Sequence, residues 1–118
     1  MPFIVYTGST HRTVEPALTV DKASRIYMNA ALRDLLGIPK GQPFHALIGY
    51  DESNGNIGLA VPGEVKDSGK LMVFDRTRYY ATAKGFVSKH AIKPGRYVRI
   101  PQNWNGWHQF RREDILNP

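Results

Sequence analysis

The sequence predicts a mainly β protein built from two similar halves, with one short helix in each half. Two Asn-Gly pairs, at 54–55 and 105–106, stand between apolar segments, a pattern typical of tight β-hairpins. The segment KDSGK at 66–70 adds a turn signal between them. Only two stretches have the apolar spacing of a helix, and both are too short to be stable unless they pack on strands.

The first helix is predicted to begin after Asn29, a good N-cap residue, and to end at Gly37. Its apolar face is expected to consist of Ala31, Leu32, Leu35 and Leu36. The second helix is predicted within residues 83–91, AKGFVSKHA, where Phe86, Val87 and His90 have helical spacing. Each helix follows strand-like residues and precedes a turn that contains glycine.

The two halves match one another at a separation of 54 residues. The segment Ile38-Pro39-Lys40-Gly41 corresponds to Ile92-Lys93-Pro94-Gly95, and Asp21 corresponds to Asp75. The order of strand, strand, short helix, glycine turn and hairpin is the same in both halves. We therefore expect a single domain over residues 1–118 with two degenerate repeats, at about 16–62 and about 70–114.

The composition favours a protein without metal or cofactor. The 118 residues include no cysteine, so neither a disulfide framework nor a thiolate metal site is expected. The four histidines lack the spacing of metal ligands, and no P-loop or dinucleotide fingerprint occurs. We expect that the protein is not an enzyme and has no cofactor.

The apolar residues do not form a segment that would cross a membrane. No apolar run approaches the ~18 residues of a membrane span. The opening MPFIVYTG lacks the basic start and the length of a signal peptide. We expect a cytoplasmic protein with no membrane partner.

The charge is positive and lies in the second half of the chain. The net charge is +6, and residues 60–118 hold eleven of the 16 lysines and arginines. A basic excess on one part of a chain suits a polyanion such as nucleic acid.

Residues 18–62 contain two segments with a distinctive pattern. VDKASRIYM (20–28) has an aspartate and an arginine before a predicted strand, and ALRDLLGIPKG (31–41) has a short helix with LR, followed by LGI and a turn glycine. Through these segments the first repeat resembles the SpoVT/AbrB swapped-hairpin family of transcription regulators, which includes MazE-type antitoxins. The chain departs from the family pattern at Ser24, where glycine is usual, and at Asn29, where proline is usual.

The resemblance implies the three-dimensional arrangement of the two repeats. In that family two units interlock as a dimer and form a small β-barrel. Two ββαβ swapped-hairpin-like repeats with two short helices would form the same barrel from one chain. We expect either a monomer that is a pseudo-dimer or a homodimer.

The resemblance also implies a small DNA-binding transcriptional regulator with double-stranded DNA as its partner. Arg25 and Arg33 match family arginines associated with DNA contact, although both can instead pair with neighbouring aspartates. Phosphate contacts are expected from the basic residues of the second half: Arg76, Arg78, Lys84, Lys89, Lys93, Arg96 and Arg99. Arg76 and Arg78 are expected on one face of a strand.

The alternative is a protein-interaction module on the same barrel, for example a phage-like inhibitor of a host protein. Its candidate surface consists of Trp104, Trp107 and Phe110 around the second Asn-Gly turn. Aromatic residues at such a turn also pack a sheet, as do Tyr79 and Tyr80 if they do not stack on bases. An enzyme on a related barrel is a third class, which fold analogy alone does not support.

Overall fold

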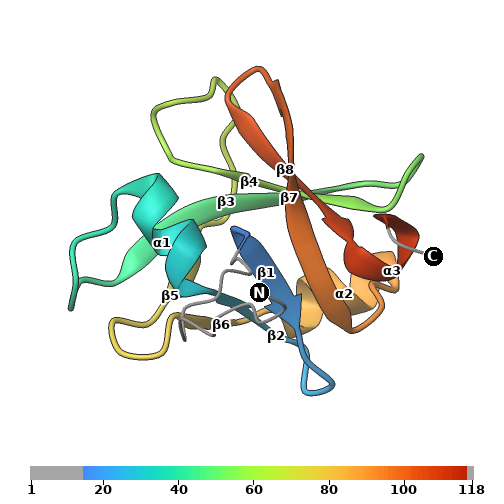
Figure 1. The fold of residues 1–118 in the computed structure, drawn as a ribbon, viewed down its shortest axis with the longest axis horizontal. Coiled ribbons are helices and arrows are strands. Elements are labelled where there is room, and N and C mark those ends of the chain that lie inside the picture. Colours follow the sequence, from blue (N-terminus) through green and yellow to red (C-terminus); the bar gives the residue numbers. More distant parts are fainter. Residues whose placement is uncertain (1–14, 117–118) are drawn as a thin grey trace, which may run out of the picture.

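The computed structural model describes residues 15–116, apart from the side chains of residues 102–104 and 116. Figure 1 shows how the strands and helices of this part of the chain are arranged. In chain order they are β1 (Ala17–Val20), β2 (Arg25–Met28), α1 (Ala30–Leu36), β3 (Phe44–Asp51), β4 (Asn56–Ala60), β5 (Met72–Phe74), β6 (Tyr80–Thr82), α2 (Lys84–His90), β7 (Gly95–Trp104), β8 (Trp107–Arg112) and α3 (Glu113–Leu116).

The described strands form one antiparallel sheet in the order β5-β3-β4-β8-β7-β1-β2-β6. Its end strands, β5 and β6, follow one another along the chain, and the Asp75 amide donates to the Tyr80 carbonyl at 3.0 Å. The sheet thus forms a nearly closed barrel, which confirms the expected mainly β barrel (Figure 1). Each half has one more strand than a ββαβ unit because both hairpin strands join the sheet, and the short α3 follows β8.

The two halves exchange their first strands. β1 pairs with β7, with Leu18 opposite Tyr97, and β5 pairs with β3, with Phe74 opposite Phe44. The turns before β2 and β6 are exchanged in the same way. The Ser24 carbonyl accepts from the Ala83 amide at 2.9 Å, and the Tyr79 carbonyl accepts from the Met28 amide at 3.2 Å. Each half therefore completes the sheet of the other.

The 54-residue separation holds at the turn aspartates, Asp21 and Asp75, and in both helices, whereas it is one residue longer in β2 and β6 and changes again after the helices. The amides of Ile38 and Ile92 donate to carbonyls one helical turn earlier, those of Arg33 and Val87. Beyond these positions the second connection is shorter. Gly95 already belongs to β7, opposite Val20, whereas Gly41 lies in a turn before β3. The two turn glycines are therefore not structural counterparts.

Both halves contribute to one apolar core inside the barrel. Alternate residues of each strand point inward. Met28 of the first half and Phe74 and Phe110 of the second are almost completely buried. α1 adds Leu32, which is fully buried. Leu35 was expected on the same buried face, but it is 46 % exposed, so this part of the expectation is wrong.

Asn29 connects the start of α1 to the start of β1. As predicted, it is the N-cap residue, and its Oδ1 accepts from the amides of Leu32 at 2.9 Å and Ala17 at 3.1 Å. Its Nδ2 donates to the Glu15 carbonyl at 2.7 Å. The corresponding N-cap of α2 is Ala83, which has no side-chain cap.

Replacing Asn29 by alanine is therefore expected to destabilise the protein. The loss of a side-chain cap costs about 0.5–2 kcal/mol, and the bond to the Ala17 amide is lost as well, so we expect about 2 kcal/mol. Urea unfolding followed by circular dichroism measures this change. Asp34→Ala, on the exposed side of the same helix, is the matched control and should shift the free energy of unfolding by less than about 0.5 kcal/mol. Equal midpoints for the two variants would contradict the structural role of Asn29.

Candidate functional site

The first candidate surface is the outer face of the β2–β6 pair, where the two halves meet. The register places Ile26 opposite Ala81, and both side chains point into the core. Because side chains alternate along a strand, Arg25, Tyr27 and Tyr80 point to the outside of the barrel.

Arg25 lies on this face between a carboxylate and an aromatic ring. Its Nε donates to Asp21 Oδ2 at 2.8 Å, and its guanidinium carbon is 5.0 Å from the centre of the Tyr80 ring. The Tyr80 ring in turn packs against Tyr27, with ring centroids 5.0 Å apart. The Arg25 side chain is still 48 % exposed, so a ligand can reach it.

Arg33 of α1 packs on the residue next to Tyr80. Its guanidinium carbon is 4.7 Å from the centre of the Tyr79 ring, and its Nε donates to the Asn29 carbonyl at 3.4 Å. Tyr79 is buried and its hydroxyl donates to the Gln42 carbonyl at 2.9 Å, which holds the ring in place. The structure thus brings Arg25 and Arg33 to consecutive tyrosines at the start of β6, a proximity the sequence did not reveal.

Two aspartates organise the turns beside these cations. The backbone amide of Arg25 lowers the pKa of Asp21, and the backbone amide of Arg78 lowers that of Asp75. Both carboxylates are therefore ionised at neutral pH, and each adds a negative charge next to basic residues.

The basic residues of the second half occupy different kinds of position. Arg76 and Arg78 lie in the turn between β5 and β6, so the expectation that they share a strand face is wrong. The three lysines of this set are exposed on α2 and in the loop after it: Lys84, Lys89 and Lys93. The two β7 arginines are less exposed. Arg96 donates to Glu113 at 2.6 Å, and Arg99 donates to His108 Nδ1 at 3.1 Å.

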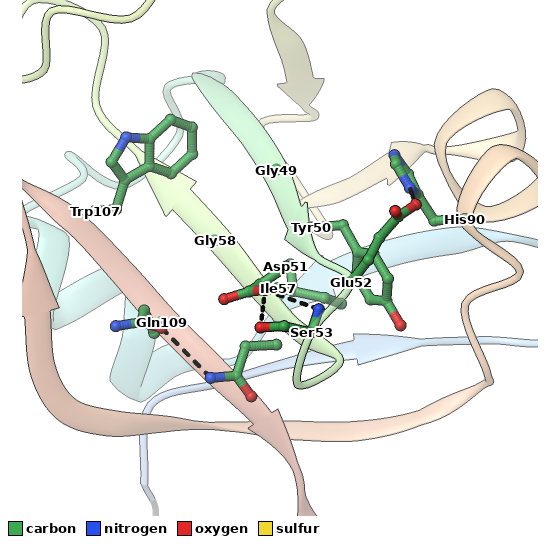
Figure 2. Close-up of a pocket in the computed structure, with 11 residues that line it drawn as sticks. Gly49, Tyr50, Asp51, Glu52, Ser53, Ile57, Gly58, His90, Trp107 and Gln109 are labelled. Atoms are coloured by element: carbon green, nitrogen blue, oxygen red, sulfur yellow. Dashed lines mark hydrogen bonds and ion pairs between the residues drawn. The ribbon is translucent and has the colours of Figure 1, made fainter.

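The second candidate surface is a groove of about 720 Å³ over β3, β4 and β8 (Figure 2). Gly49 and Gly58 leave space for the Trp107 indole, which comes within 3.6 Å and 3.0 Å of where their Cβ atoms would lie. The indole Nε1 donates to Asp67 Oδ2 at 2.8 Å. One wall of the groove is therefore a fixed aromatic ring.

The other end of the groove is acidic. The Ser53 hydroxyl donates a hydrogen bond to Asp51 Oδ1 and is the main cause that lowers the pKa of Asp51, and the Ser53 backbone amide adds to the effect. Glu52 Oε2 lies 3.2 Å from His90 Nδ1, and the His90 ring packs against Tyr50 at 5.1 Å (Figure 2). Among the described residues that line the groove there is no lysine or arginine.

The three aromatic residues expected at a protein-binding surface have different positions. Phe110 is completely buried opposite Ile57, so it belongs to the core and cannot contact a partner of the folded chain. Trp107 lines the groove, and the backbone of Trp104 pairs with it across the second Asn-Gly turn. The Trp104 side chain lies outside the described part. Gly49 and Gly58 were not among the residues expected at a site, although a glycine in each of two paired strands is a signal for close packing.

The described residues hold no cluster of metal-binding side chains. Within residues 15–116, no three His, Asp or Glu residues are close enough together to bind a metal ion. None of the helices in the same range has the length and hydropathy needed to cross a bilayer.

The environment of His108 predicts that the free energy of unfolding depends on pH. Burial, followed by the nearby Arg99 charge, lowers the pKa of His108 below its usual 6.5. The unfolded chain therefore binds this proton more readily than the folded chain, so the free energy of unfolding falls as the pH drops below about 6.5. Above that pH, His108 does not make the free energy of unfolding depend on pH.

Denaturant unfolding at several pH values between 5 and 8 measures this effect. His108→Gln keeps an acceptor for Arg99 and should flatten the acid side of the curve. The control His45→Gln, at an exposed position of β3, should retain the slope of the original protein. A slope that persists in His108→Gln would show that other groups cause it.

Comparison with known proteins identifies no family for this chain. No protein-family model, curated protein or solved structure matches this chain. The resemblance to the AbrB family accordingly stays a prediction, carried by the residues of the first repeat.

Proposed function

We propose that this chain is a small, non-catalytic DNA-binding protein, a transcriptional regulator of the AbrB-like type. The observation that carries the proposal is that two arginine guanidinium groups pack over the neighbouring rings of Tyr79 and Tyr80. Arg33 and Arg25 come from different elements, α1 and β2, yet both reach the start of β6.

Guanidinium groups held in this way suit a DNA backbone or base edge. A guanidinium presents several N–H donors in one plane and binds phosphate or guanine through two of them. Contact with a tyrosine ring restricts the arginine side chain before DNA arrives, so less conformational entropy is lost on binding. Asp21 competes for Arg25, and a phosphate would have to share or replace that contact.

The remaining exposed cations would supply affinity that does not depend on sequence. Arg76 and Arg78 lie in the turn just before Tyr79, and Lys84 is the first residue of α2, separated from β6 by Ala83. Neutralising DNA phosphates releases counterions, so binding through such residues weakens steeply with added salt.

Fluorescence anisotropy with mixed double-stranded DNA at 50 and 200 mM salt tests this proposal. We expect salt-dependent binding, and an increase in Kd of about tenfold for Arg25→Ala or Arg33→Ala, since one such contact contributes about 1–3 kcal/mol. Lys70→Ala, an exposed cation in the connection before β5, is the matched control and should bind almost unchanged. Absence of binding at 50 mM salt would overturn the proposal, and an Arg25→Ala variant equal to Lys70→Ala would remove Arg25 from the site.

The second candidate is a protein partner that docks in the groove with a basic side chain. A lysine stem could lie along the Trp107 ring while its ammonium group reaches the acidic end at Asp51 and Glu52. The groove supports this candidate because its described lining combines an aromatic wall with carboxylates and includes no lysine or arginine. An inhibitor of another protein could use such a surface.

A short peptide of alternating lysine and leucine is a defined probe for the groove. Because the chain has two tryptophans, Trp104→Phe leaves Trp107 as the only indole reporter. We expect the peptide to change Trp107 fluorescence, and Glu52→Gln to weaken binding about threefold, as for an exposed ion pair. Asp34→Asn on α1 is the control and should not change binding. No fluorescence change, or equal binding by the two variants, would contradict the groove as a docking site.

A further inference from the structure

We infer that this chain recognises a DNA site without two-fold symmetry, with one chain per site. The inference rests on the proposed DNA binding. It concerns the outer face of the β2–β6 pair, which lies across an internal two-fold axis of the barrel.

Reciprocal hydrogen bonds define this axis. The Ser24 carbonyl binds the Ala83 amide, and the Tyr79 carbonyl binds the Met28 amide. Exchanging the two halves turns one bond into the other, so Ser24 corresponds to Tyr79, and both have positive φ, 61° and 57°. β2 and β6 pair directly with one another, and the axis therefore passes between them.

The residues next in the chain show that this face is asymmetric. Arg25 follows Ser24, and its counterpart after Tyr79 is Tyr80. The cation of one half thus corresponds to an aromatic ring in the other, and the Arg25 guanidinium lies on that ring at 5.0 Å. Because Arg25 packs on its own counterpart, the two halves cannot present the same group to a ligand. Tyr27 likewise corresponds to Thr82.

The helices on the two sides of the molecule repeat this difference (Figure 1). The helices align with a separation one residue shorter than β2 and β6 do, because Ala83 both matches the end of β2 and takes the N-cap position that Asn29 has in α1. Arg33 and Val87 are counterparts in the helices, since their amides donate to the carbonyls of these two N-caps, Asn29 and Ala83. The same alignment sets Leu35 of α1 against Lys89 of α2. α1 thus carries an arginine where α2 is apolar, and α2 carries a lysine where α1 is apolar.

Among the described turns and helices beside the axis, one cation has a cationic counterpart. Lys22 and Arg76 both follow the turn aspartates, Asp21 and Asp75. The other basic residues compared above, Arg25, Arg33 and Lys89, have counterparts without a positive charge: Tyr80, Val87 and Leu35.

This asymmetry determines the kind of DNA site. Two identical protein halves related by a two-fold axis favour a palindrome, because each half contacts the same bases. Here an arginine-containing side and a lysine-containing side would face the duplex. Arginine reads base edges and phosphates through two parallel bonds, whereas lysine acts as a point charge. A palindrome therefore offers no advantage, and one chain supplies both halves.

Selection of binding sites from a random 20-base-pair duplex pool with the full chain tests the inference. We expect an enriched motif without a dyad and a 1:1 complex by sedimentation. Duplexes in which either half of that motif is copied onto the other are expected to bind at least about tenfold more weakly, since one mismatched base pair costs about 1–3 kcal/mol. Selection with Arg25→Ala should lose the preference on one side of the motif, whereas Lys70→Ala should select the original motif.

The outcomes separate this inference from the proposed function. A palindromic motif, two chains per duplex, or DNA binding without any enriched motif would overturn the inference and leave DNA binding in place. Failure to bind any duplex at low salt would overturn both. Circular dichroism of each variant confirms that a loss of binding does not reflect unfolding.

Discussion

The exchange of first strands between the two halves is the constraint on which the rest of the structure depends. β1 completes its hydrogen bonds with β7, and β5 does so with β3, so neither half has a complete sheet of its own. The exchange also closes the barrel, which leaves few unpaired strand edges. Leu18 and Phe74, one from each exchanged strand, are fully buried in the shared core. Separation of the halves would expose both the strand edges and these side chains.

The same exchange places both candidate surfaces where a strand of one half pairs with its counterpart in the other. β2 pairs with β6 beneath the arginine–tyrosine face, and β4 pairs with β8 beneath the groove. Each surface is therefore built from residues far apart in the chain. Arg25 meets Tyr80, and Gly58 meets Trp107, only because the two halves are interlocked.

Local features of the fold were predictable from the sequence, and contacts between the halves were not. Asn29 caps the start of α1 with its side chain and Gly37 caps its end with its backbone amide, both through residues three or four positions away, and the structure confirms both ends. The Arg25–Tyr80 contact depends on the register between β2 and β6, which no local pattern determines. Successive side chains of β8 point alternately to the core and to the groove, and Phe110 points to the core. Which of the two sets is buried depends on the strands that pair with β8, and the local sequence does not determine these.

A single chain also allows the two helices to differ in how they are held. α1 has a side-chain cap at Asn29 and ends at Gly37 with φ of 68°, a conformation that suits glycine. α2 has no such cap and ends at Ala91 with φ of 51°, where a Cβ is unfavourable. Packing must therefore hold α2 in place, through Phe86 and His90 against Tyr50 of the other half. The difference in capping and the difference in surface charge have one origin. One chain encodes both halves, so a residue in one half can change without a change at its counterpart in the other.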